Sequence, residues 1–427
     1  MIKFSRVARN RRVSFPLVID QPLLRFGVLG GAQLTGSALS FLTAVIITQV
    51  GGATVFGQIS LSLSVLSYAL IATNFGTDVS AVRMAATHPA SVGGMLPAIF
   101  LIRLFFASVS FGAIFLLMPL LQPDPQGQLV VLIICASLFA ACFFPAWLPQ
   151  GTENLKVTAL CVLGPFAATF LLTVISGLVA PSAVAFAMSR IGGDALVALA
   201  LSCWALRFYS RTGWNVLRST IGDLLRQSGP IAGTQMVRGL GFFSDILVVS
   251  FFYDDAVLGH FSAAYRIYLL LVAISAMYFI VLFPRLARAA VSGGGALRAE
   301  LRAALLWTVP ATAGLLLVFM GVVPWLLPLA FGQDFAAAVP ALQLLGVAAA
   351  LNFVHKNYSR ALIAMGQPGS EFRMTAIATL VGVALKVIGT WHWGITGTAL
   401  AIILGEAVLL VLLRCSATTK LVSETAR

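Results

Sequence analysis

Val55-Phe56-Gly57-Gln58-Ile59-Ser60 and Val257-Leu258-Gly259-His260-Phe261-Ser262 resemble each other and lie 202 residues apart. A second match has the same offset: Gly31-Ala32-Gln33-Leu34 recurs as Gly233-Thr234-Gln235-Met236. In each copy the two motifs stand at either end of one long apolar stretch. Two matches at one spacing indicate that the chain arose by internal duplication.

The duplicated motifs lie in a chain that is too apolar for a soluble protein. Of its 427 residues 59% are hydrophobic and 10% are charged, and the mean hydropathy is +0.98. A helix needs roughly 20 apolar residues to cross a bilayer. Twelve stretches are about long enough, and they predict an all-α polytopic membrane protein. Their ranges are 26–48, 58–76, 96–118, 129–148, 158–178, 183–206, 229–252, 257–283, 305–329, 337–361, 374–391 and 395–413.

Lysine and arginine are placed so that they orient these spans. Both tails and every second connecting segment carry them, as at Arg83 and Arg211. The other six loops carry none and hold acids instead: Asp124, Asp254, Asp255 and Asp334. Cytoplasmic loops are rich in Lys and Arg, so both termini are predicted to be cytoplasmic. The net charge of +13 therefore reflects topology and contact with anionic membrane lipids, and not nucleic-acid binding.

Six spans per copy is an even number, so the two repeats are expected to be parallel. Parallel repeats are related by an axis along the membrane normal. We therefore expect two six-helix bundles around a central cleft, an arrangement suited to alternating access. The expected divisions are a cytoplasmic tail (1–25), an N-terminal bundle (26–206), a cytoplasmic linker loop (207–228), a C-terminal bundle (229–414) and a cytoplasmic tail (415–427).

Nine charges remain inside the predicted spans, where each needs a partner or a wet cavity. The bases are Arg103, Arg190, Arg238, Arg266, Lys356 and Lys386, and the acids are Asp194, Asp245 and Glu406. Arg190 and Asp194 are an i,i+4 pair on one helix and are expected to neutralise each other. Lys356 is expected to reach the cytoplasmic surface beside Arg360. Lys386 and Glu406 lie at similar depth on consecutive helices and are expected to pair.

Arg238 and Arg266 are expected near mid-membrane on neighbouring helices. Asp245 shares a helix face with Arg238, but one carboxylate cannot readily serve both arginines. A positive charge should then remain in the cleft, extended by Arg103 and Arg25, and these four arginines are the predicted substrate-binding residues. Arginine binds phosphate in a bidentate manner and keeps its charge when desolvated, so an anionic lipid head group is the expected ligand. Asp245, Glu406 and Lys386 are candidates for ion coupling or charge pairing.

The sequence offers little for other chemistry. The five cysteines read as small packing residues, since four lie inside predicted spans. We find no metal-ligand cluster, nucleophile motif or paired-carboxylate motif, so neither a metal nor another cofactor is expected, and we expect a transporter rather than an enzyme.

Four segments carry a resemblance to a known family. They are Pro145-Ala146-Trp147-Leu148-Pro149-Gln150-Gly151-Thr152-Glu153-Asn154-Leu155-Lys156, Leu258-Gly259-His260-Phe261-Ser262-Ala263-Ala264-Tyr265-Arg266-Ile267, Phe331-Gly332-Gln333-Asp334-Phe335 and Gly394-Ile395-Thr396-Gly397-Thr398-Ala399. They resemble segments of the bacterial oligosaccharide-lipid flippases of the polysaccharide-export type. That family shares a superfamily with the multidrug-and-toxin extruders.

The resemblance implies a flippase of the bacterial inner membrane. Its substrate would be a polyprenyl-pyrophosphate-linked oligosaccharide, carried to the periplasmic leaflet for O-antigen, capsule or exopolysaccharide synthesis. Polysaccharide polymerase and chain-length proteins would be its partners. Two alternatives stay open at this point. One is a multidrug-and-toxin cation antiporter on the same fold, which should have an acidic cleft. The other is a membrane glycan polymerase or ligase, which should have polar groups in an outer loop.

Overall fold

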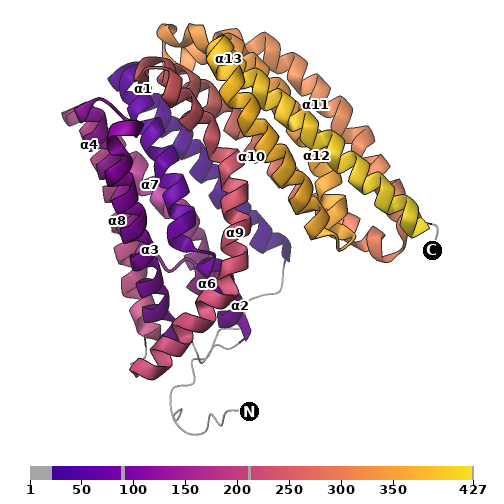
Figure 1. The fold of residues 1–427 in the computed structure, drawn as a ribbon, viewed down its shortest axis with the longest axis horizontal. Helices are drawn as coiled ribbons and strands as arrows, with labels where there is room; N and C mark the ends of the chain where they lie inside the picture. The colour runs from indigo at the N-terminus through magenta and orange to yellow at the C-terminus, as the bar shows by residue number, and fades with distance from the viewer. Residues whose placement is uncertain (1–21, 88–91, 210–212, 426–427) are drawn as a thin grey trace.

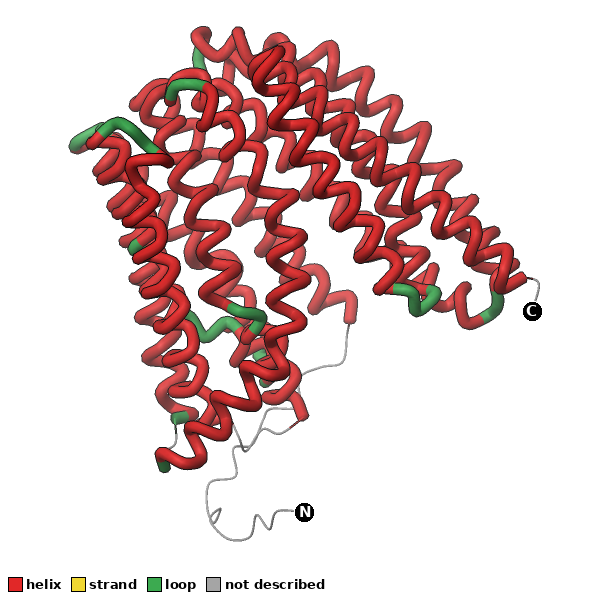
Figure 2. Tube along the Cα trace, viewed as in Figure 1, coloured by secondary structure: helices red, strands yellow, loops and turns green. Residues whose placement is uncertain are grey.

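The computed structural model describes residues 22–87, 92–209 and 213–425, and every regular element in these ranges is helical (Figure 1, Figure 2). The first half contains α1 (Pro22–Asn74), α2 (Thr77–Thr87), α3 (Val92–Leu121), α4 (Pro125–Cys135), α5 (Ser137–Cys142), α6 (Trp147–Gly151), α7 (Leu155–Val179), α8 (Ala183–Ala205) and the 3-10 turn η2 (Leu206–Phe208). The second half contains α9 (Trp214–Phe252), α10 (Asp255–Val291), α11 (Gly294–Phe331), the 3-10 helix η3 (Gln333–Ala338), α12 (Val339–Ala364) and α13 (Pro368–Thr425).

Ten helical segments are long and apolar enough to cross a membrane, and two of them are long enough to cross twice. These two are Gly27–Asn74 and Pro368–Leu421, with 48 and 54 residues. At 1.5 Å per residue they measure about 70 and 80 Å, more than twice the thickness of the hydrocarbon core. Each bends at a glycine with positive φ, Gly52 at 78° and Gly394 at 62°. Counting each as two crossings confirms the twelve expected spans.

Two helix boundaries recur at the same offset in the two halves. The offset of 202 places the bend at Gly52 opposite Asp254, where α9 has ended and α10 begins. The Asp254 carboxylate accepts a hydrogen bond from the backbone N–H of Val257 at 3.0 Å and so caps α10. The next helices, α3 and α11, begin at Val92 and Gly294, again 202 residues apart. The structure is therefore consistent with a parallel duplication.

The helices form two groups that lean together at one end. Helices α3, α4, α7 and α8 lie on one side, and α11, α12 and α13 lie on the other (Figure 1). Between them α1 packs closely against α10. The groups meet at the end where α1 bends and spread apart toward the end where α13 terminates (Figure 1). This arrangement is consistent with the two bundles predicted from the sequence.

The expected linker loop is largely helical, so that part of the prediction was wrong. Residues 214–228 are the first part of α9, which then continues to Phe252 without a break. The reason is an apolar spacing of three to four residues at Leu217, Ile221 and Leu224. Leu224 is fully buried against residues of the first half, including Trp147. The first part of α9 is thus docked on the N-terminal bundle.

Two other boundaries differ from the prediction. The tail expected at 415–427 continues α13 to Thr425, because Ala417 and Leu421 are buried against neighbouring helices. The span expected at 129–148 is broken into α4, α5 and α6. Pro145 explains the break between α5 and α6, because proline lacks an N–H group and disfavours helical geometry at the residue before it.

Candidate functional site: the cavities between the bundles

Three cavities lie between the two halves of the chain. The central cavity, about 180 Å³, is lined by α1, α7 and α8 on one side and by α9 and α10 on the other. The side pocket, about 60 Å³, extends among α1, α7 and α8 of the N-terminal bundle and includes Arg266 of α10. The mouth, about 540 Å³, lies between the end of α1 and the middle of α9. No aspartate or glutamate of the described residues lines any of the three.

Arg266 lines both the central cavity and the side pocket. It lies on α10 among buried neighbours, since Tyr265 and Ile267 are 4% and 5% exposed. No hydrogen bond or ion pair joins its guanidinium group to another residue that the structure describes. The Arg266 guanidinium group thus lies beside these two cavities without an ion-pair partner among the described residues, and its role in substrate binding stays a prediction.

Arg190 lies opposite, on α8 of the N-terminal bundle, and lines the same two cavities. Its Nε donates to Asp194 Oδ2 at 2.9 Å, which confirms the expected i,i+4 pair. The sequence did not predict that Arg190 lines the same cavities as Arg266. An ion pair within one helix does not determine which neighbouring helices or cavities that pair faces. Arg190, Asp194 and Arg266 together leave one net positive charge beside the cavities.

Arg238 lines the mouth and not the central cavity. Its Nη2 donates to Glu371 Oε2 of α13 at 2.8 Å, and its side chain is 52% exposed. Glu371 was missed because it precedes the predicted span at 374–391. Asp245, the partner considered for Arg238 in the sequence, bonds elsewhere.

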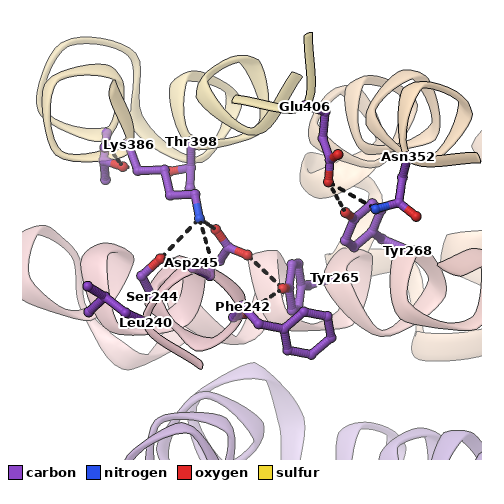
Figure 3. Close-up of polar contacts among 12 residues, drawn as sticks. Leu240, Phe242, Ser244, Asp245, Tyr265, Tyr268, Asn352, Lys386, Thr398 and Glu406 are labelled. Carbon is purple, nitrogen blue, oxygen red and sulfur yellow. Dashed lines mark hydrogen bonds and ion pairs between the residues drawn. The ribbon is translucent and has the colours of Figure 1, made fainter. Parts of the chain in front are cut away.

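Lys386 pairs with Asp245 and not with Glu406, so the expected Lys386–Glu406 pair was wrong (Figure 3). The Lys386 Nζ lies 2.5 Å from Asp245 Oδ1 in an ion pair, and it donates to Ser244 Oγ and Gly241 O at 3.0 Å each. Tyr265 donates its hydroxyl to the other Asp245 oxygen at 2.6 Å. Similar depth could not distinguish Glu406, which lies on the same helix α13 as Lys386, from Asp245 on α9.

Glu406 has its own partners inside the C-terminal bundle. His355 Nε2 lies 2.6 Å from Glu406 Oε2, while Asn352 and Tyr268 donate to Oε1 at 3.2 and 3.4 Å (Figure 3). Glu406 and the Lys386–Asp245 pair line one inner cavity of about 170 Å³ within that bundle. The contact of His355 with Glu406 was not predicted, since the two residues are 51 positions apart in the chain.

Arg103 does not line the described cavities, so its expected place beside the substrate was wrong. Its guanidinium group pairs with Asp78 and donates to Thr77 Oγ1 at 3.3 Å. It also donates to Phe144 O at 2.9 Å, a carbonyl group left free by the break before α6. The residue is 2% exposed. It therefore joins α2, α3 and the broken fourth span.

Two further expectations concern bases near helix ends. Lys356 does not extend toward Arg360 as expected, because its Nζ donates to Ser275 Oγ of α10 at 2.9 Å. Arg25 lies at the start of α1, but its side chain falls outside the described residues. Its predicted place beside the substrate stays a prediction.

The fold and its cavities define a class of protein, the polytopic membrane proteins with two helical bundles around a central space. Among solved structures, an inward-facing multidrug resistance MATE family transporter of the MOP superfamily superimposes with a TM-score of 0.73 at 15% identity, covering 91% of this chain and 95% of its own. The lipid II flippase MurJ in an inward closed conformation also gives 0.73, at 15% identity and with 92% and 87% of the chains covered. An outward-facing MATE family transporter gives 0.59 at 14% identity, with 94% and 96% covered.

Sequence comparison then gives the family. The family model described as polysaccharide biosynthesis protein matches residues 25–290, and the chain belongs to this family. A curated relative, the probable low-salt glycan biosynthesis flippase Agl15 of Haloferax volcanii, is 27% identical over 176 residues. That match covers 39% of this chain and 36% of the relative, so it spans about a third of the relative's length.

Proposed function

We propose that this protein is a flippase for a lipid-linked glycan whose carrier ends in phosphate or pyrophosphate. It would move the glycan from the cytoplasmic to the periplasmic leaflet of the inner membrane, for O-antigen, capsule or exopolysaccharide synthesis. The observation that carries the proposal is the unpaired Arg266 guanidinium in the cavities between the bundles. A buried charge in a membrane protein is costly unless a ligand or water compensates it.

The charge distribution favours an anionic ligand. Arg190 and Arg266 face the same two cavities from opposite bundles, and no described acid lines them. A phosphate group accepts paired N–H donors from arginine and keeps its own charge at neutral pH. The glycan and the lipid carrier are supported by the family and by the curated flippase relative, since charge alone does not distinguish a lipid phosphate from other anions.

Alternating access would carry the substrate across. The bundles diverge toward the end where α13 terminates, and the positive-inside pattern of the loops assigns that end to the cytoplasm (Figure 1). The mouth at Arg238 would then admit the head group from the cytoplasmic leaflet.

The same observations weigh against a cation antiporter. The acids Asp245 and Glu406 line the inner cavity of the C-terminal bundle and none of the three cavities between the bundles. Asp245 is ion-paired with Lys386, and Glu406 lies 2.6 Å from His355 Nε2. An organic cation bound between the bundles would meet Arg266 and Arg190. We therefore do not retain the hypothesis of a multidrug-and-toxin cation antiporter.

Deletion of the chromosomal gene in its host tests the proposal. We expect surface glycan to disappear and lipid-linked repeat units to accumulate on the cytoplasmic leaflet, with both defects restored by the wild-type gene and not by Arg266→Ala. Quantitative extraction of lipid-linked glycan from the mutant, in a background without a paralogue, gives the measurement. Normal surface glycan in that strain would contradict the proposal.

A further inference from the structure

The N-terminal bundle presents a row of hydroxyl groups to the cavities, and the C-terminal bundle does not. Seven serine or threonine residues of α1 and α7 form this hydroxyl wall: Ser40, Thr43, Ser60, Ser64, Ser67, Thr169 and Thr173. On the side of the C-terminal bundle the described lining is Arg266 with apolar and aromatic residues. The only hydroxyl among these is that of Tyr265, which already donates to Asp245.

Because the two repeats are related by a fixed offset, the two sides of the central cavity can be compared position by position. Ser64 and Arg266 are 202 residues apart, so they occupy equivalent positions in the two repeats, and both line the central cavity. One repeat thus carries a neutral hydroxyl where the other carries a positive charge. Ser60, Ser64 and Ser67 are spaced to lie on one face of α1.

Three hydroxyl groups of the wall have no hydrogen-bond partner among the described residues. They belong to Ser60, Thr169 and Thr173, whose side chains are 1%, 8% and 1% exposed. Serine and threonine in membrane helices usually donate to a carbonyl group one turn earlier, as Ser67 does to Leu63 O at 2.7 Å. A buried hydroxyl without a partner is unfavourable, so these three are suited to a ligand that supplies hydrogen bonds.

From this arrangement we infer that the hydroxyl wall binds the sugar residue nearest the phosphate of the lipid-linked substrate. The inference rests on the proposed function and adds the position of the sugar. A sugar hydroxyl both donates and accepts, as the wall does, whereas a polyprenyl chain does neither and would leave the wall unsatisfied. The sugar attached to the phosphate is the part of the glycan that must lie within reach when Arg266 holds the phosphate.

The side pocket also has the apolar surface that a sugar ring needs. Phe56, Phe166 and Phe186 line it together with Thr169 and Thr173. Small-molecule sites commonly combine an aromatic lining with a few placed polar groups. The carrier's phosphate and its first sugar would therefore contact opposite bundles and hold them together until the bundles rearrange.

Binding of two probes to the purified full-length protein in nanodiscs tests the inference. One probe is polyprenyl pyrophosphate, and the other is the same lipid bearing one neutral monosaccharide. Thr173→Val and Ser60→Ala should each weaken binding of the sugar-bearing probe by about 3- to 10-fold, the range for one neutral hydrogen bond, and leave the bare probe unchanged. Arg266→Ala should weaken binding of both probes.

Ser262→Ala is the matched control, because Ser262 is the repeat equivalent of Ser60. Its hydroxyl is equally buried and unpartnered, but it lines none of the cavities described above. This variant should bind both probes normally. If Thr173→Val and Ser60→Ala weaken both probes equally, or change neither, the sugar site is wrong while the flippase proposal stands. If wild-type protein binds neither probe, the proposed function fails and the sugar site fails with it.

Discussion

Arg266 differs from three other arginines of the membrane helices in having no counter-ion among the residues that the structure describes. Arg103 pairs with Asp78, Arg190 with Asp194 and Arg238 with Glu371. A charge that folding leaves unpaired at such a depth reduces stability and is best explained by a binding role. An arginine whose guanidinium group has its hydrogen-bond and ion-pair partners within the protein is best explained by a structural role.

The difference in bonding between Arg103 and Arg266 predicts different effects on stability when each is replaced by alanine. Arg103→Ala should lower the free energy of unfolding by about 2–5 kcal/mol, because it removes a large buried side chain and leaves the carbonyl group of Phe144 without its donor. Arg266→Ala should leave the melting temperature in detergent equal to or above that of the wild type. A large loss of stability in Arg266→Ala would show that Arg266 supports the fold.

The Lys386–Asp245 ion pair predicts a coupling between two substitutions. Asp245→Asn should cost about 3–5 kcal/mol, since it leaves the buried Lys386 ammonium without its counter-ion. The double variant Asp245→Asn/Lys386→Met should recover most of that loss, measured by thermal unfolding. Glu406→Gln/Lys386→Met is the control, and its effects should add. Recovery in the control pair instead would restore the Lys386–Glu406 pairing expected from the sequence.

The sequence predicted most of the fold and part of the candidate site, and the errors in the predicted partners have a physical cause. Hydropathy and the spacing of basic loops predicted the twelve crossings, and the depth of Arg266 predicted its unusual position. Depth along a helix does not determine the rotation of that helix about its axis. Arg103, Lys386 and Glu406 were therefore placed at reasonable depths but assigned to the wrong surface or partner. His355 and Glu371 could not be found without their neighbours from distant helices.

At the scale of the elements, α1 and α10 cross with unusually close backbones. A Cβ atom on Gly57 would lie 1.8 Å from the carbonyl oxygen of Asp255, and one on Gly259 would lie 2.0 Å from that of Ala53. The four positions are related in pairs by the offset of 202, so the contact is made twice by the pseudo-symmetry of the repeats. It lies at the end where the bundles meet, and we propose that it closes the periplasmic side.

Gly57→Ala should weaken this closure. The added methyl group meets a backbone carbonyl that cannot move alone, so α1 and α10 must separate there. Spin-label distances between the bundles at the periplasmic end should shift toward longer values, with a lower transport rate. Gly389→Ala adds a methyl group 2.6 Å from Gly397 O inside α13 and is the control for steric damage. If both variants lose stability and neither lengthens the distances, the contact is only a packing feature.

At the scale of the whole molecule, the direction of transport depends on the orientation in the membrane. We predict that both termini and the first part of α9 face the cytoplasm, and that the segment between α3 and α4 faces the periplasm. This follows from basic residues such as Arg218 in the first location and Asp124 in the second.

Labelling with a membrane-impermeant thiol reagent checks the orientation, in a variant whose five cysteines have been replaced. Ser219 and Gln126 are exposed positions on the two proposed sides. Gln126→Cys should react in intact spheroplasts, and Ser219→Cys only after permeabilisation. The reverse pattern would invert the topology and place the mouth at Arg238 on the periplasmic side.

Flipping in proteoliposomes tests most directly whether Arg266 binds the phosphate end of a lipid-linked glycan. The purified protein is reconstituted with a fluorescent polyprenyl-pyrophosphate-linked oligosaccharide, and its transfer between leaflets is followed with a membrane-impermeant quencher. We predict transfer by the wild type, a loss of about 10- to 100-fold in Arg266→Ala, as expected for hydrogen bonds to a charged group, and partial activity in Arg266→Lys, which keeps the charge without the bidentate geometry. Transfer by Arg266→Ala at the wild-type rate, with equal amounts of folded protein, would contradict the account.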